Sequence, residues 1–305
     1  MKKIIIFTFF IILIPYIVLS IYQKNIKEIK LYTSSGTNIR VKRLKTNTID
    51  TLDINEYILG VLAGEMPISF DIEALKAQAV ASRSYALKRI EYNKDKDYDV
   101  VDSITNQVYL DTEYLKKTWG NNYIKNINKL KTAVNDTYNE YLEYNGKVAD
   151  ALFFSTSNGY TEDSNLVFNF EASYLKSVSS PWDKEVTPTY EKQITISLTD
   201  FYKKLSLPYQ DNLNIEILQR SSTNRILKLK INNKEFTGRE IYKKLSIRST
   251  DFTIQKDKDN VIITTKGYGH GVGMSQYGAL GMAKLGYTYN EILTYYYQNT
   301  KVKKL

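Results

Sequence analysis

The hydrophobic pattern of the chain begins with its longest apolar run. Residues 4–22, "IIIFTFFIILIPYIVLSIY", carry no charge over 19 positions and follow Met1, Lys2 and Lys3. A helix needs about 20 apolar residues to cross a bilayer core. The run is apolar on every side, which argues against a buried globular helix. It is long for a signal peptide and has no clear small-residue cleavage site. We therefore expect residues 1–25 to be an uncleaved membrane anchor, with the rest of the chain outside the cytoplasm.

Strand patterns follow the anchor. Residues 29–52 alternate apolar and polar positions around a Ser-Gly turn, which predicts short strands. The segment "YLEYNGKVADALFF", residues 141–154, predicts a hairpin that turns at Asn145 and Gly146. Residues 190–265 contain further strand patterns, so this region is a candidate second lobe.

Helical spacing separates these strands. Apolar residues recur at positions i, i+3, i+4 and i+7 in a first helix, which begins after Asp53, a typical N-cap residue. The same spacing predicts helices within 71–90, 117–134, 198–205 and 238–245. A Gly-rich loop that leads into helices closes the chain.

These patterns predict an α+β fold of mixed helices and antiparallel strands. Residues 26–305 are expected to form one folded unit, with a candidate second lobe at about 190–265 and a cleft between the lobes. The 305 residues, of which 43% are hydrophobic, suffice for a substantial core.

Charge and composition restrict the function. The net charge of +9 favours an anionic partner such as nucleic acid, an anionic lipid surface or an acidic wall polymer. A location outside the cytoplasm argues against nucleic acid. The chain has no cysteine and a single histidine, His270, so disulfides and thiolate metal sites are excluded. We expect no metal and no cofactor, because zinc sites draw mainly on Cys and His.

One acid lies on the apolar face of the first predicted helix. Glu65 continues the spacing of Ile54, Ile58 and Val61, so its carboxyl group should point inward. Pro67 disfavours helical geometry at the preceding residue, which places Glu65 at the end of the helix. Burial raises the pKa of a carboxyl group, as a general acid near neutral pH requires. The alternative is a structural glutamate paired with an arginine, for which Arg83 on the next helix is the candidate.

Five blocks of the sequence carry a resemblance to a known family. The blocks are "EYILGVLAGEMP", "ALKAQAVASRSYAL", "FFSTSNGYTE", "RSTDF" and "GYGHGVGMSQYGALGMAKLGYTYNEILTYYY". They resemble the stage II sporulation protein D family, which consists of membrane-anchored lytic transglycosylases that act on peptidoglycan. The resemblance runs from about Ile29 to Val302 and implies that Glu65 is the catalytic acid.

The chain departs from this family at four positions. Many members carry two cysteines in a C-D-x-x-x-C-Q-V-Y block and a histidine before S-T-S, which together can hold zinc. Val101, Asn106 and Phe154 stand at these places here. Their joint replacement argues against bound zinc in this chain. Asn158 also replaces the first glycine that usually follows S-T-S.

The resemblance implies cleavage of the bond between N-acetylmuramic acid and N-acetylglucosamine without water. The C6 hydroxyl of the muramic sugar attacks its own C1, so a single carboxyl can act first as acid and then as base. Hydroxyl and amide side chains suit a sugar ligand. The candidate substrate-binding residues are Arg83, Ser155, Thr156, Ser157, His270, Ser275, Gln276 and Tyr277. For His270 the alternative is a packing role that holds the loop in place. For Ser155, Thr156 and Ser157 the alternative is an ordinary polar loop.

Two competing functions fit the sequence less well than this one. An acyl-transfer pair of Ser155 and His270 lacks a nucleophile elbow and a second histidine. A wall-binding scaffold or amidase activator would have no reason to keep Glu65 in an apolar setting. The family further implies septal wall remodelling during engulfment, in the space between the mother-cell and forespore membranes. Expected partners are peptidoglycan glycan strands, a sporulation amidase and a polytopic membrane protein.

Overall fold

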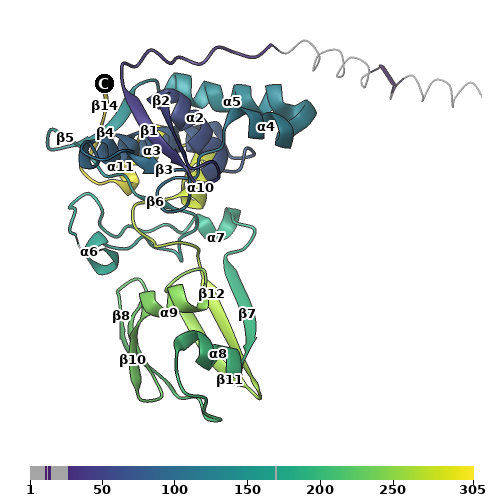
Figure 1. Ribbon diagram of the computed structural model, residues 1–305, viewed down its shortest axis with the longest axis vertical. Helices are drawn as coiled ribbons and strands as arrows, with labels where there is room; N and C mark the ends of the chain where they lie inside the picture. Colours follow the sequence, from purple (N-terminus) through teal and green to yellow (C-terminus); the bar gives the residue numbers. More distant parts are fainter. Residues whose placement is uncertain (1–10, 12, 15–26, 169) are drawn as a thin grey trace, which may run out of the picture.

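The computed structural model describes residues 11, 13–14, 27–168 and 170–305 (Figure 1). The expected membrane anchor, residues 1–25, lies almost entirely outside them. No helix within the described part of the chain is long and apolar enough to cross a membrane.

The larger hydrophobic core, in what we call the first lobe, is built around five helices. The central helix α3 packs against α2, α5, α10 and α11 (Figure 1). Small sheets flank these helices, with strand orders β2-β1-β3, β14-β4-β5 and β13-β6. The helices of this lobe are α2 (Ile54–Glu65), α3 (Ile72–Tyr92), α4 (Thr112–Trp119), the 3-10 turn η1 (Gly120–Asn122), α5 (Tyr123–Asp136), α6 (Ser164–Val167), α7 (Asp183–Val186), α10 (Gln276–Lys284) and α11 (Tyr289–Tyr296). Its strands are β1 (Asn38–Arg43), β2 (Thr48–Asp53), β3 (Val100–Val101), β4 (Glu140–Tyr144), β5 (Lys147–Val148), β6 (Phe153–Phe154), β13 (Met274–Ser275) and β14 (Lys301–Lys304).

Local chemistry sets the ends of these elements. The carboxylate of Asp53 accepts a hydrogen bond from the Asn55 N–H at 2.8 Å and begins α2. Asn145 and Gly146 both have positive φ, 50° and 77°, as a tight hairpin turn requires. The first predicted turn was misplaced: β1 and β2 are joined by residues 44–47, while the Ser-Gly pair precedes β1.

Residues 191–266, which we call the second lobe, have their own hydrophobic core. Strand pairings β11-β12-β7 and β10-β9-β8 form two antiparallel sheets, and two short helices, α8 and α9, pack against each other. Each helix buries the face that its apolar spacing predicts, including Phe201 and Ile241. The elements are β7 (Glu191–Ser197), α8 (Leu198–Leu205), β8 (Ile215–Arg220), β9 (Ile226–Ile231), β10 (Lys234–Thr237), α9 (Gly238–Leu245), β11 (Phe252–Asp257) and β12 (Asn260–Lys266).

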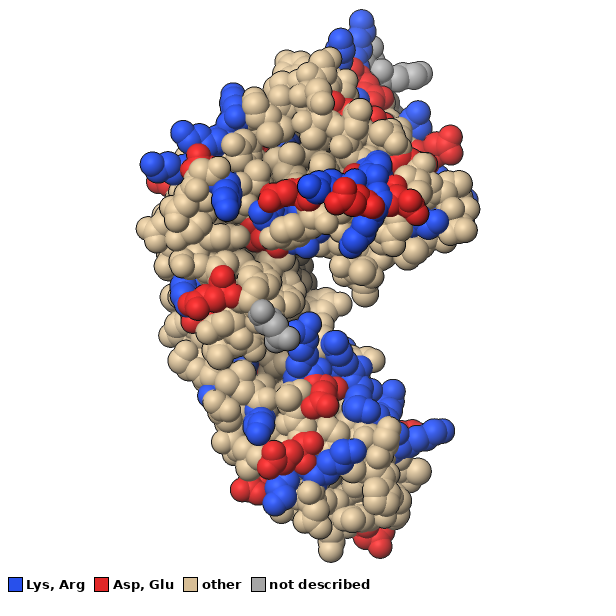
Figure 2. All heavy atoms as spheres, turned by 60° about the vertical axis from the view of Figure 1, so that its left-hand side comes forward, with Lys and Arg blue, Asp and Glu red and all other residues tan. Residues whose placement is uncertain are grey.

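The second lobe is inserted between β6 and β13 of the first lobe. These two strands pair in parallel, as do β1 and β3, so the expectation of antiparallel strands holds only in part. The N–H of Gly267 donates to the carbonyl of Tyr190 at 2.9 Å, where the chain enters and leaves the second lobe. Figure 2 shows the surface hollowed between the two lobes, with Lys and Arg gathered on the lower wall of the hollow. The fold is therefore mixed α+β with several small sheets.

Candidate functional site

Glu65 is the last residue of α2, as its spacing predicts. Two glycines one turn apart, Gly60 and Gly64, let the chain at 108–110 cross this helix closely. A Cβ at Gly64 would lie only 2.4 Å from the carbonyl oxygen of Val108. Because the two backbones touch, the N–H of Val108 reaches the carboxylate of Glu65, with an N to Oε1 distance of 2.6 Å. The glycines thus position the acid.

The surroundings of Glu65 favour its protonated form. Burial raises the pKa of Glu65 above its ordinary value of 4.5, and hydrogen bonds from the Val108 N–H and the Gln276 side chain only partly oppose this rise. Within the described part of the chain Glu65 is in no ion pair. A partly exposed carboxyl group of this kind can exchange a proton with a ligand.

The Gly-rich block brings Gln276 to Glu65 and Tyr277 to Ser155. Gln276 begins α10 and is the amide partner of Glu65. The N–H of Tyr277 donates to the carbonyl of Ser155 at 3.0 Å, and the ring of Tyr277 packs edge-on against Phe70 at 5.0 Å. Ser155 and Tyr277 are both partly exposed, so they remain accessible to a ligand.

Two predicted sugar contacts, Ser157 and Ser275, are instead part of a buried network around Asp183. Both serines are fully buried. The carboxylate of Asp183 accepts hydrogen bonds from the Ser157 N–H at 2.7 Å, the Ser180 hydroxyl at 2.6 Å and the Ser275 hydroxyl. The pKa of Asp183 is raised above its ordinary value, because the effect of burial exceeds the opposing effect of these hydrogen bonds. Thr156 is buried as well, in a bridge to Tyr268. The side chains of these three residues are therefore closed to solvent.

Arg83 is neither a substrate contact nor the partner of Glu65. Its side chain has no exposed surface. Nε donates to the Asn55 side chain at 3.1 Å and Nη1 to the carbonyl of Glu140 at 2.8 Å. It therefore joins the start of α2, the middle of α3 and β4. The sequence prediction failed here because an arginine on an apolar helical face can bond to backbone carbonyls of a distant strand as well as to an acid.

Comparisons with known proteins identify the family of this chain. A family model described as "Stage II sporulation protein" matches residues 42–144, and one described as "Domain of unknown function (DUF8618)" matches residues 112–273. Stage II sporulation protein D of Bacillus subtilis (strain 168) is 39% identical over 276 residues, which cover 89% of this chain and 80% of that protein. The chain belongs to the stage II sporulation protein D family.

Two further relatives support this family assignment. Stage II sporulation protein D of Bacillus amyloliquefaciens is 40% identical over 88% of this chain and 80% of that protein. A Bacillus subtilis (strain 168) protein named "Amidase enhancer" is 30% identical over 79% of this chain, but over only 39% of its own length. The resemblance found in the sequence is thereby confirmed at the level of the family.

Two of the three positions where many family members carry zinc ligands, Val101 and Asn106, are joined by a hydrogen bond in this chain. The Asn106 side chain accepts from the Val101 N–H at 2.9 Å and donates to the Tyr85 hydroxyl at 3.0 Å. Phe154, at the histidine position, is buried and lies 5.7 Å from the His270 ring. Valine and phenylalanine offer no donor atoms, and the asparagine oxygen is already used. These residues do not fit a zinc ion.

His270 holds the Gly-rich block of this family member in place. Its Nδ1 accepts the N–H of Val272 at 3.1 Å, and its ring lies between Phe154 and Phe168. Burial and the nearby Arg225 lower the pKa of His270 to about 4, so the ring is neutral at physiological pH. This geometry matches the predicted packing role. The ring also lines a cavity between the lobes.

Asp183 and Val108 are the positions that the sequence did not reveal. Asp183 stands at the start of a short helix, where an aspartate is commonplace, and its partners lie up to 92 residues away. Val108 contributes only its backbone N–H to Glu65. Neither leaves a local pattern that sequence reasoning could use.

Proposed function

We propose that this protein is a lytic transglycosylase that cleaves the MurNAc-GlcNAc bond of peptidoglycan and leaves 1,6-anhydro-MurNAc ends. The observation that carries the proposal is Glu65, a part-buried carboxyl group with a raised pKa and no ion pair among the described residues. Most glycosidases use two carboxylates. A single carboxyl suffices when the nucleophile belongs to the substrate itself.

The chemistry assigns Glu65 two steps. In its protonated form it gives a proton to the glycosidic oxygen as the bond to C1 breaks. The resulting carboxylate then takes the proton of the C6 hydroxyl while that oxygen bonds to C1. The Val108 N–H and the Gln276 amide stabilise the carboxylate between these steps and orient it. Ser155 and Tyr277, which are both partly exposed, are the proposed contacts to the sugar.

The setting of this reaction is also proposed. The apolar segment 4–22 supports a single membrane anchor, with the catalytic domain in the space between mother-cell and forespore membranes. Its substrate there would be the glycan strands of the septal wall during engulfment. A sporulation amidase that removes stem peptides and a polytopic membrane protein are the partners that fit this setting.

The direct test is mass spectrometry of the products from purified, peptide-free glycan strands. We expect the full chain to release fragments that end in 1,6-anhydro-MurNAc. Fragments with hydrolysed reducing ends would instead indicate a hydrolase, and an unchanged polymer would contradict enzymatic cleavage.

The second candidate, a wall-binding amidase activator, is favoured by the 30% identity to the protein named "Amidase enhancer". An amidase assay on intact peptidoglycan, with and without this chain, separates the two functions. An activator raises the release of stem peptides while the glycan products stay unchanged.

The rate of cleavage should depend on pH through Glu65. Because its pKa in the folded protein lies above 4.5, the proton is retained to higher pH than on a free glutamate. We expect kcat/KM to fall as pH rises through this raised pKa, since the general acid is lost. The contribution of this group to stability has the same sign: it is present below pH 4.5 and is lost as pH rises through the folded-state pKa. A pH–rate profile whose alkaline limb lies at the pKa of Glu65, found by titration against a Glu65→Gln variant, would agree; a limb elsewhere would not.

A further inference from the structure

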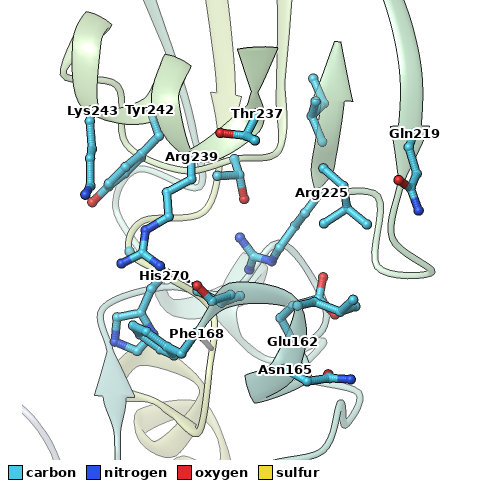
Figure 3. A pocket seen from close by; sticks show the side chains of 16 residues that line it. Glu162, Asn165, Phe168, Gln219, Arg225, Thr237, Arg239, Tyr242, Lys243 and His270 are labelled. Atoms are coloured by element: carbon cyan, nitrogen blue, oxygen red, sulfur yellow. Dashed lines mark hydrogen bonds between the residues drawn. The ribbon is translucent and has the colours of Figure 1, made fainter. Parts of the chain in front are cut away.

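A cavity of about 600 Å³ lies between the lobes, on the side of His270 (Figure 3). The segment that contains Glu162 and Phe168 forms its lower wall. Helix α9 of the second lobe forms the opposite wall with Arg239, Tyr242 and Lys243. This volume lies within the range of small-molecule sites and is sufficient for a sugar residue with a substituent. Glu65 is not among its lining residues, so the cavity is separate from the candidate catalytic group.

Positive charge exceeds negative charge in this cavity. Arg225, Arg239 and Lys243 line it, and among the described residues none of the three is in an ion pair. Glu162 is the one carboxylate of the lining. It is buried and accepts hydrogen bonds from the hydroxyl groups of Ser221, at 2.5 Å, and Thr223. Both hydroxyl groups donate to Oε2, and Oε1 accepts the N–H of Asp163 at 3.1 Å. Both oxygens of Glu162 are therefore already engaged, which leaves the cations to attract a ligand.

Arg225 is a buried cation with unused donors. Its side chain is 1% exposed, and within the described part of the chain its Nε and Nη1 have no hydrogen-bond partner. Nη2 donates to the Asn158 side chain at 3.3 Å. Gly271, with φ of 88°, lies flat against the guanidinium, where a Cβ would come within 2.6 Å. Figure 3 shows this guanidinium between Arg239 and Glu162. A buried guanidinium with unpaired N–H groups is costly unless an anion completes it.

The remaining lining is apolar and neutral. The Phe168 ring lies 5.3 Å from the guanidinium carbon of Arg239, which stacks on it. His270 adds no positive charge, because its pKa is about 4. Leu166 and Ile226 extend the apolar surface. This combination suits an organic anion better than a small hydrated one, since the apolar surface needs carbon atoms to cover it.

We propose that this cavity is a binding subsite for a carboxylate-bearing group of the wall polymer, held by Arg239 and Lys243 with Arg225 beneath them. The identity of the polymer rests on the proposed function, whereas the requirement for an organic carboxylate rests on the cavity alone. Two parts of peptidoglycan carry this chemistry: the lactyl group of a peptide-free muramic residue and the stem peptide. The subsite would hold a glycan strand at a distance from Glu65 and so select the section of strand that is cut.

The test is a binding titration followed by ligand-observed NMR, on the full chain in detergent micelles and carrying Glu65→Gln. The probes are N-acetylmuramic acid, its lactyl methyl ester, the tripeptide L-Ala-γ-D-Glu-L-Lys and inorganic phosphate. We expect the sugar acid to bind about tenfold or more tightly than its ester, which is the size of one charge-assisted hydrogen bond. Stronger binding of the tripeptide, with the same charge dependence, would assign the stem peptide as the source of the carboxylate.

Variants locate the binding to the cavity. Arg239 and Lys243 are exposed, so the double variant Arg239→Gln/Lys243→Gln should fold and weaken carboxylate binding about tenfold or more. Arg225→Lys keeps the charge and removes the fork of donors. Lys203→Gln, an exposed lysine on α8 outside the cavity lining, is the matched control and should have no effect. Equal binding of acid and ester, displacement by an equal concentration of phosphate, or no effect of the double variant would each overturn the proposal. Because binding is read without cleavage, these outcomes are independent of whether Glu65 is catalytic.

Discussion

Replacing Glu65 with glutamine is expected to abolish glycan cleavage while the chain remains folded. The amide can still accept the hydrogen bond from the Val108 N–H, so the end of α2 should keep its structure. It cannot give a proton to the leaving oxygen or take one from the C6 hydroxyl. General acid–base catalysis contributes about 10²–10⁴ in rate, so we expect a loss at least of this order. The measurement is the release of 1,6-anhydro ends from peptide-free strands.

A control for this variant lies on the same helix. Glu56 is exposed on α2, so Glu56→Gln makes the same chemical change away from the site and should cleave at the wild-type rate. Strand binding by Glu65→Gln should also persist. Wild-type release of anhydro ends by Glu65→Gln would remove Glu65 from the mechanism.

The largest effect on stability is expected from Asp183→Ala. This change removes the buried acceptor of the Ser157 N–H and of the hydroxyl groups of Ser180 and Ser275, which keep only their other contacts. One hydrogen bond contributes about 1 kcal/mol net, so the three lost bonds should lower the free energy of unfolding by about 3 kcal/mol. Urea unfolding followed by circular dichroism measures it.

The matched control is Glu185→Ala, an exposed acid two residues farther along α7. It should change the free energy of unfolding by less than about 0.5 kcal/mol, as is usual for surface positions. If the two alanine variants were equally stable, the network around Asp183 would not support the fold. Because Ser275 immediately precedes Gln276, we also expect Asp183→Ala to reduce cleavage through displacement of that amide.

Local rules predicted much of the fold. The first helix begins after Asp53 and ends at Glu65, and the short helices at 198–205 and 238–245 have the expected bounds, because caps and apolar spacing are local. The first hairpin turn was predicted at the Ser-Gly pair, because glycine favours left-handed backbone conformations. In the structure the left-handed residue of this turn is Asn47, with φ of 58°. Parallel pairing of β6 with β13 was not predicted, since it joins segments more than 100 residues apart.

The candidate site could also be predicted only in part. Glu65 could be predicted because a carboxylate on the apolar face of a helix is unusual, and helical spacing shows that face in the local sequence. The burial of Ser157 and Ser275 could not be predicted, because the Ser157 N–H and the Ser275 hydroxyl meet Asp183 only in the folded chain. The same limit applies to Arg83, whose partners are an asparagine and a backbone carbonyl. Residue type shows which chemistry is available, but only long-range packing decides which way a side chain faces.

The backbone hydrogen bond between Gly267 and Tyr190 has an evolutionary consequence. The two ends of the second lobe meet at this bond, so a few residues could replace 191–266 without redirecting β6 or β13. The second lobe is thus encoded by one continuous segment. Exchange of that segment between family members would replace the second-lobe wall of the cavity and leave Glu65 and α2 untouched.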